Sequence, residues 1–109
     1  MASKSTPQLI FGAASFGAAF REAKDAQSVL DLLQSHNIKR IDTAGRYPPT
    51  DPGRSEELLG IVKAPEQGFT IDTKILAWSG DGSGELKREK IEESVSTSLR
   101  RLDVSKVYV

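Results

Sequence analysis

The chain has 109 residues, enough for one small domain, and its 15 basic residues balance its 15 acidic residues. The zero net charge gives no electrostatic reason to expect nucleic acid or an anionic membrane as a partner, and no apolar run approaches the roughly 20 residues of a membrane-spanning helix. The absence of cysteine and the single histidine exclude a disulfide framework and a thiolate or histidine metal site, so we expect a cytoplasmic protein without a metal.

The predicted elements begin with an apolar strand over residues 8–12. A first helix follows, whose apolar side chains recur on one face, at Ala26, Val29, Leu30 and Leu33. A strand over residues 39–42 leads to a short second helix, for which Ser55 is the predicted N-cap. A strand over residues 69–75, a third helix and a strand over residues 106–109 complete the order. The third helix is the clearest, with apolar residues at i, i+4, i+8 and i+11: Ile91, Val95, Leu99 and Leu102.

This alternation of strands and helices indicates an α/β fold with a parallel sheet and right-handed crossovers. An open doubly wound sheet and a (β/α)8 barrel both fit the order. The turn from Gly12 to Gly17 lacks the middle glycine of the dinucleotide-binding motif G-x-G-x-x-G, and residues 80–84 are interpreted as a flexible loop. Four strands are about half of a barrel of roughly 250 residues, and the last strand pattern runs to Val109. We therefore expect a fragment of a barrel; the alternative is a complete four-stranded domain whose last strand lies at an edge.

A carboxylate, an ammonium group and a phenol are predicted to converge at one edge of the sheet. Asp42 and Lys74 end the second and third predicted strands, and Tyr47 lies in the loop after Asp42. The functional groups of parallel α/β folds gather at the carboxyl ends of the strands. An ammonium group beside Tyr47 would lower the pKa of its phenol, and Asp42 would hold that ammonium group in place. Such a phenol suits protonation of the alkoxide that forms when a hydride reduces a carbonyl. From spacing alone, ordinary turn, packing and surface roles stay equally open.

Four motifs, in their order along the chain, resemble the aldo-keto reductase family. They are Asp42-Thr43-Ala44-x-x-Tyr47, Ser55-Glu56-x-x-Leu59-Gly60, Thr73-Lys74 and Ser98-Leu99-Arg100-Arg101-Leu102. The resemblance covers nearly the whole chain from Leu9 onward. It implies that residues 1–109 are a partial aldo-keto reductase domain, the N-terminal half of a (β/α)8 TIM barrel. Residues 41–47 and 73–78 look most like the aflatoxin-aldehyde reductase branch and its fungal relatives.

The resemblance also implies a function, that of an NADPH-dependent oxidoreductase that reduces aldehydes or ketones to alcohols. By position, Tyr47 would be the proton donor, Lys74 would lower its pKa, and Asp42 would pair with Lys74 near the nicotinamide ribose. The turn Gly12-Ala13-Ala14 would pass under the nicotinamide end of the NADPH cofactor. Trp78, after the third strand, would either line the substrate pocket or pack against the barrel rim.

The chain also departs from the family pattern. The family's catalytic histidine ends the fourth strand, a few residues beyond Val109, and strands five to eight supply most contacts to the cofactor. His36 follows the first helix and is expected at the opposite face, as a surface or helix-end residue. We therefore expect negligible activity from the isolated chain. One alternative is a non-catalytic truncated product that associates with itself or with a full-length relative through an open sheet edge. Another is a different barrel enzyme, such as a phosphate-binding isomerase, which is disfavoured because such phosphate sites follow strands seven and eight.

Overall fold

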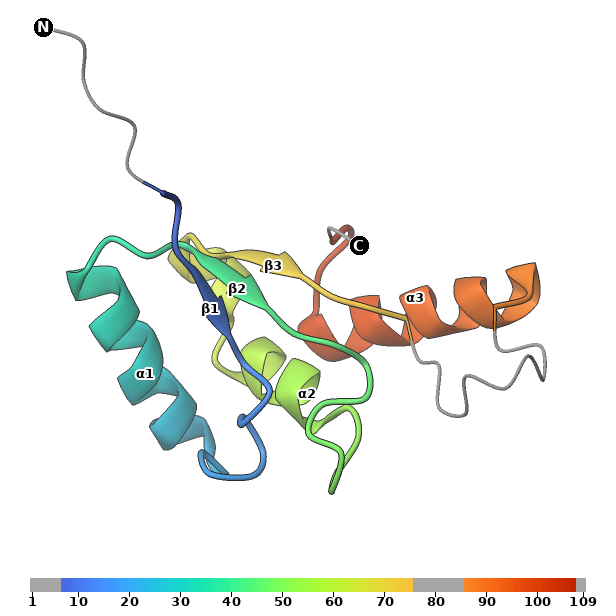
Figure 1. The fold of residues 1–109 in the computed structure, drawn as a ribbon, viewed down its shortest axis with the longest axis horizontal. Coiled ribbons are helices and arrows are strands. Elements are labelled where there is room, and N and C mark those ends of the chain that lie inside the picture. Colours follow the sequence, from blue (N-terminus) through green and yellow to red (C-terminus); the bar gives the residue numbers. More distant parts are fainter. Residues whose placement is uncertain (1–6, 76–85, 108–109) are drawn as a thin grey trace, which may run out of the picture.

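The computed structural model describes residues 7–75 and 86–107, and strands and helices alternate along them (Figure 1). The elements are β1 (Ile10–Gly12), α1 (Ala23–Ser35), β2 (Arg40–Asp42), α2 (Arg54–Ile61), the 3-10 helix η1 (Ala64–Gln67), β3 (Thr70–Asp72) and α3 (Arg88–Leu102). The first six elements of the predicted order, from the first strand to the third helix, are therefore confirmed. The strands themselves are shorter than the apolar segments that predicted them.

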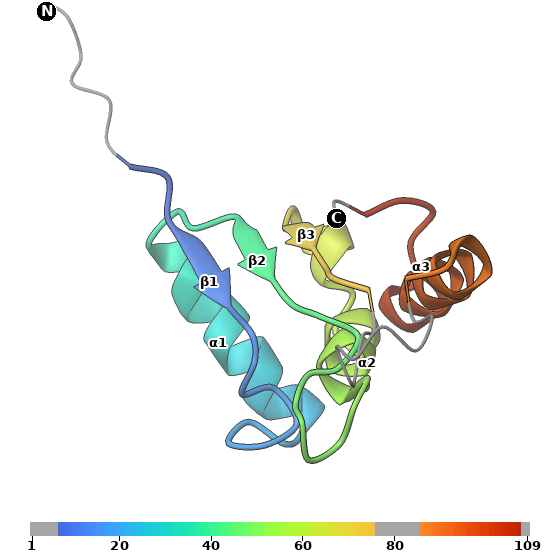
Figure 2. The same ribbon diagram turned by 45° about the vertical axis from the view of Figure 1, so that its right-hand side comes forward.

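The three strands form a parallel sheet in the order β1-β2-β3. Phe11, Ile41 and Ile71 lie side by side across the sheet, and the next row is Gly12, Asp42 and Asp72. Because successive residues of a strand face opposite sides, the first row faces the helices and the second row faces away from them. Helices α1 and α2 lie on the same side of the sheet (Figures 1 and 2). The sheet therefore has an apolar face under helices and a polar face that no described helix covers.

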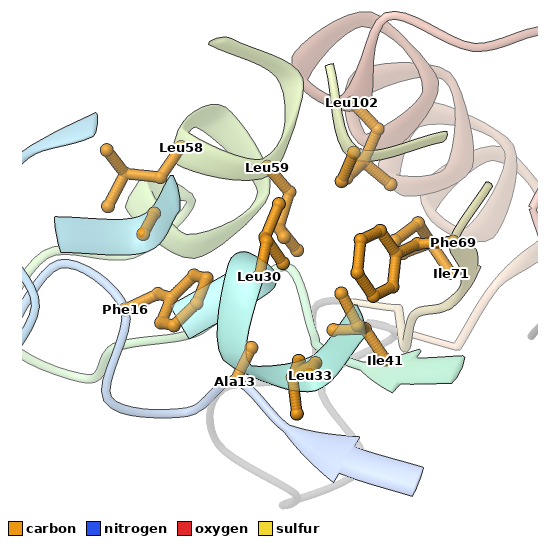
Figure 3. Packing of buried hydrophobic residues seen from close by; sticks show 12 residues of the cluster. Ala13, Phe16, Leu30, Leu33, Ile41, Leu58, Leu59, Phe69, Ile71 and Leu102 are labelled. Atoms are coloured by element: carbon orange, nitrogen blue, oxygen red, sulfur yellow. The ribbon is translucent and has the colours of Figure 1, made fainter. Parts of the chain in front are cut away.

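The hydrophobic core fills the space between the sheet and these two helices (Figure 3). Leu30 of α1, Leu58 and Leu59 of α2, and Ile41 of β2 are all completely buried. Burying a leucine or isoleucine side chain stabilises a fold by about 1.5–3 kcal/mol. The predicted apolar face of α1 is confirmed, since its buried residues are Ala26, Leu30 and Leu33 and Val29 packs against the core. This core fixes the distance between the helices and the strand ends that carry the polar residues.

The ends of α1 explain the position of the only histidine. The helix begins with a capping box in which the backbone N–H of Glu22 donates to the Asp25 carboxylate at 3.1 Å. It ends at Ser35 with His36 as its C-cap, and Asn37 follows in the left-handed region with φ 56°, a conformation that asparagine tolerates at helix ends. The exposed His36 therefore lies just before β2, at the end of the sheet opposite the carboxyl ends of the strands. The prediction for this residue is confirmed.

Ser55 is not the N-cap of α2. The cap is Gly53, with φ 89°, and the helix begins at Arg54, so Ser55 lies inside the first turn and is completely buried. A left-handed residue before the helix is a conformation that glycine adopts without strain. Ser55 was predicted as the cap because serine is a preferred cap residue, but the cap is Gly53, two residues earlier.

The predicted fourth strand does not form in the residues that the structure describes, and the apolar face of α3 is only partly buried. Lys106 and Val107 do not form a strand, and residues 108 and 109 lie outside the described residues. The helix α3 forms as predicted, but Leu102 is the only member of its predicted apolar face that is fully buried. Its C-terminal end packs against α2, whereas its first turns extend beyond β3 (Figure 1). The apolar residues in those turns, Ile91 and Val95, are only partly buried.

Candidate active site

The carboxyl ends of β2 and β3 carry an ion pair. The Lys74 ammonium group, two residues beyond β3, donates to the Asp42 carboxylate at 2.8 Å and to the carbonyl oxygen of Thr43 at 2.9 Å. The Lys74 and Asp42 side chains are 49% and 40% exposed. Exposed pairs of this kind contribute at most about 1 kcal/mol to stability. The contact therefore matters chiefly because it places a positive charge at this edge of the sheet.

Tyr47 lies against the same ammonium group. The Lys74 nitrogen is 5.0 Å from the centroid of the Tyr47 ring, within the range of a cation–π contact. The backbone of Tyr47 is fixed on both sides, because its N–H donates to Ala44 at 3.1 Å and its carbonyl oxygen accepts the N–H of Ser55 at 3.1 Å. The lysine was expected beside the phenol oxygen, and besides its contact with the ring a hydrogen bond with the Tyr47 side chain contributes to the raised pKa of Lys74. The three side chains predicted to converge are thus brought together.

The charge on Lys74 is favoured by its surroundings. Partial burial opposes the charged form, but the hydrogen bond and the negative charge of Asp42 outweigh that effect, with a further contribution from Tyr47. The net result is that the pKa of Lys74 is raised above its ordinary value of 10.5. At neutral pH this lysine is therefore a fixed positive charge next to a phenol.

A cleft of about 420 Å³ opens beside these groups. Tyr47 and Lys74 line it together with Ala44, Arg46, Pro49 and Ile75. It combines small apolar walls with a phenol and positive charges, the mixture typical of sites for small organic molecules. Arg46 was missed as a lining residue, and the only signal for it was its place between Ala44 and Tyr47.

The turn after β1 has accessible and inaccessible residues. Gly12 and Ala14 are exposed, and a Cβ atom built on Gly12 would meet nothing within 4 Å. Ala13 is completely buried, and its backbone N–H donates to the Asp42 carbonyl oxygen at 2.8 Å. Because Gly12 lies beside Asp42 in the sheet, the open space above it adjoins the Asp42–Lys74 pair. Gly12 and Ala14 are therefore the accessible residues of this turn.

A family model for the aldo/keto reductase family matches residues 8–108 of the chain. The chain belongs to the aldo/keto reductase family.

The three similar proteins described next are much longer than this aldo/keto reductase chain. A probable voltage-gated potassium channel subunit beta of Arabidopsis thaliana is 36% identical over 95 residues, which make up 81% of this chain and 27% of the relative. A solved structure from Pseudomonas aeruginosa, assigned to the aldo-keto reductases, has 28% identity and a TM-score of 0.75 and covers 92% of this chain and 38% of that one. The holo form of an aldo-keto reductase from Bacillus halodurans has 27% identity and a TM-score of 0.66, and covers 92% and 33%. The chain thus spans between 27% and 38% of their lengths, and its fold matches an incomplete fragment of the reductase barrel.

The buried hydroxyl groups of Thr43 and Ser55 are hydrogen-bonded beside the site of this aldo/keto reductase, and the sequence did not predict this. The Ser55 hydroxyl donates to the carbonyl oxygen of Ala13 at 2.9 Å and lies 2.8 Å from the Thr43 hydroxyl. A carbonyl oxygen can only accept, so the single proton of Ser55 goes to Ala13 and Thr43 is the donor in the second bond. Ser55 thereby joins the residues that directly follow β1 and β2.

Other predicted positions fall outside the described residues or away from the site. Trp78 and the glycine-rich segment 80–84 are not among the described residues.

Within residues 7–75 and 86–107, no three histidine, aspartate or glutamate side chains come together in a way that could hold a metal ion. In the same part of the chain, no helix is long and apolar enough to cross a membrane.

Proposed function

We propose that this chain supplies the proton-donor part of a site that reduces aldehydes or ketones to alcohols with NADPH. The observation that carries the proposal is the contact of Tyr47 with Lys74, which Asp42 holds at the mouth of a cleft. Family membership supports the reaction class. NADPH as the cofactor, and an affiliation with the aflatoxin-aldehyde reductase branch, belong to the proposal on the strength of the motifs alone.

The proposed chemistry divides between the cofactor and the chain's own residues. When bound, the nicotinamide supplies a hydride to the carbonyl carbon. The Tyr47 hydroxyl then gives its proton to the carbonyl oxygen, and the positive charge of Lys74 stabilises the negative charge that develops on the phenol oxygen. Asp42 and the Thr43 carbonyl oxygen keep Lys74 in place during this transfer. The apolar walls at Pro49 and Ile75 would receive the hydrocarbon part of the substrate.

A chimeric protein tests this proposal. The segment of the Pseudomonas aeruginosa relative that superposes on this chain is replaced by residues 7–107, and the remainder of the relative is kept. We expect a folded chimera that reduces an aromatic aldehyde and oxidises NADPH in equal amounts. A folded chimera that binds NADPH but shows no turnover would argue against this chain as the donor of a working site.

The isolated chain is proposed to be inactive. His36, the one histidine of the sequence, cannot serve as the catalytic histidine that the family resemblance implies, because it lies at the opposite end of the sheet from Tyr47. The measurement is NADPH oxidation by the 109-residue chain in the presence of a reactive aromatic aldehyde. Steady turnover that Tyr47→Phe removes would show that the isolated chain is a complete catalyst and would overturn this expectation.

A second candidate function is association through the uncovered face and edge of the sheet. Leu9 and Ile10, at β1, are 63% and 49% exposed, and the Arabidopsis relative is itself named as a subunit. The occupant would be a second copy of the chain or a longer relative. Light scattering of the chain over a range of concentrations measures this directly, with Ile10→Asp as the disrupting variant. A monomer at every concentration, with a sharp unfolding transition, would count against association.

A further inference from the structure

The first acidic residue of α2 is buried completely. Glu56 has no exposed surface, whereas its neighbour Glu57 is 52% exposed. A buried carboxylate is costly unless it is paired and hydrogen-bonded. The contacts of Glu56 therefore show which groups compensate for the cost of its burial.

The two oxygens of Glu56 bind two different segments. One accepts the Thr73 hydroxyl at 2.7 Å, and the other accepts the Arg101 guanidinium of α3 at 3.2 Å. Among the described residues, no buried side-chain nitrogen or oxygen is left without a partner. Glu56 therefore joins α2, the segment after β3 and the end of α3 in one closed network.

Arg101 is itself held closely by the glycines of α2. A Cβ built on Gly53 would overlap the Arg101 guanidinium, and one built on Gly60 would overlap its backbone carbonyl oxygen. The two glycines thus allow α3 to approach α2 until the guanidinium reaches the buried carboxylate. This close approach fixes Glu56 from the side opposite Thr73.

Thr73 directly precedes Lys74, and the backbone on either side of it is tied to the chain after β2. The carbonyl oxygen of Asp72 accepts the N–H of Thr43 at 2.8 Å, and that of Lys74 accepts the N–H of Gly45 at 3.1 Å. Between these two backbone bonds the side chain of Thr73 could still rotate, and the hydrogen bond of its hydroxyl to Glu56 holds it in one position. The direction in which Lys74 leaves the strand end is then set from both sides.

We propose that Glu56 is a positioning residue, whose hydrogen bond to Thr73 directs Lys74 onto Asp42 and the Tyr47 ring. The value of this placement for catalysis rests on the proposed function, but the placement itself does not. Arg101 anchors Glu56, so the docking of α3 and the geometry of the proton-donor site are coupled.

The test measures where Lys74 lies rather than how stable the chain is. In the 109-residue chain at neutral pH, NMR reports contacts between the ε-methylene protons of Lys74 and the ring protons of Tyr47, and the upfield shift caused by the ring. Thr73→Val is expected to weaken those contacts and reduce that shift, because it removes the hydroxyl and keeps the shape. Thr73→Ser restores the hydroxyl and is expected to restore both signals.

The matched control is Glu57→Gln, an exposed change one residue away, which is expected to leave the Lys74 signals unchanged. Glu56→Met removes both acceptor oxygens and keeps the length of the side chain, and we expect a change in the same direction as Thr73→Val. It serves as the second variant if Thr73→Val does not fold. Folded Thr73→Val or Glu56→Met chains with wild-type Lys74 signals would overturn the proposal.

The outcome is separable from that of the proposed function. If the Lys74 signals move as expected while a chimera turns over equally well without the Tyr47 hydroxyl, the positioning role stands and the proton-donor role fails. If the signals do not move while turnover depends on Tyr47, the reverse holds.

Discussion

Removing the Ser55 hydroxyl is expected to destabilise the fold far more than an ordinary serine-to-alanine change. Ser55→Ala takes away the donor to the Ala13 carbonyl oxygen and the acceptor for the Thr43 hydroxyl. Ser55, Ala13 and Thr43 are all completely buried. A buried polar group that loses its partner costs about 1–3 kcal/mol, so two such groups cost roughly 2–6 kcal/mol. A domain of this size has only about 5–15 kcal/mol in total.

Urea unfolding of the 109-residue chain, followed by circular dichroism, measures this loss. The matched control is Ser28→Ala, also within a helix, whose exposed hydroxyl donates to the Lys24 carbonyl oxygen at 3.0 Å; its unfolding midpoint is expected to change little. Thr43→Val should cost less in the Ser55→Ala background than alone, because the shared hydrogen bond is already gone. Equal, small losses for Ser55→Ala and Ser28→Ala would refute the inference that the Ser55 hydroxyl holds two strand ends.

Two further predictions concern α3 and pH. Gly60→Ala should lower the free energy of unfolding by about 1–3 kcal/mol through overpacking, because its Cβ would overlap the Arg101 carbonyl oxygen. The control Gly12→Ala has nothing within 4 Å of its Cβ and should change the unfolding midpoint little. Similar midpoints for the two variants would contradict the close approach of α3. Because the pKa of Lys74 is raised in the folded chain, its stabilising effect is complete below its ordinary value of 10.5 and is lost as pH rises through the folded value. The stability difference between wild type and Lys74→Gln should therefore be constant near neutral pH and shrink above pH 10.5; a difference that shrinks on acidification instead would show that another group is responsible.

The sequence predicted the helices, and the polar end of the sheet, from patterns that depend on local structure. Leu30 and Leu33 lie on the buried face of α1 because 3.6-residue periodicity needs only one apolar partner surface. Asp42 and Lys74 meet because parallel strands end at a common edge, whatever their exact lengths.

The features that were missed depend on tertiary contacts. Ser55 was predicted as a cap because serine often is one. The cap is instead Gly53 with its positive φ, so Ser55 lies inside α2, where its buried hydroxyl donates to the Ala13 carbonyl oxygen. Glu56 was noted only as part of a family motif, and its burial depends on the approach of Arg101 and Thr73. Ile91 lies on a correctly predicted helix but remains partly exposed, since periodicity indicates a face and not the element that covers it.

The proton-donor role of Tyr47 is the central claim, and single-turnover kinetics of the chimera with NADPH and an aromatic aldehyde test it most directly. Tyr47→Phe keeps the ring that contacts Lys74 and removes only the hydroxyl. The account predicts that the rate of the chemical step falls by about 10²–10⁴-fold, while NADPH binds as tightly as before. A chemical step of unchanged rate in a folded Tyr47→Phe chimera would contradict it.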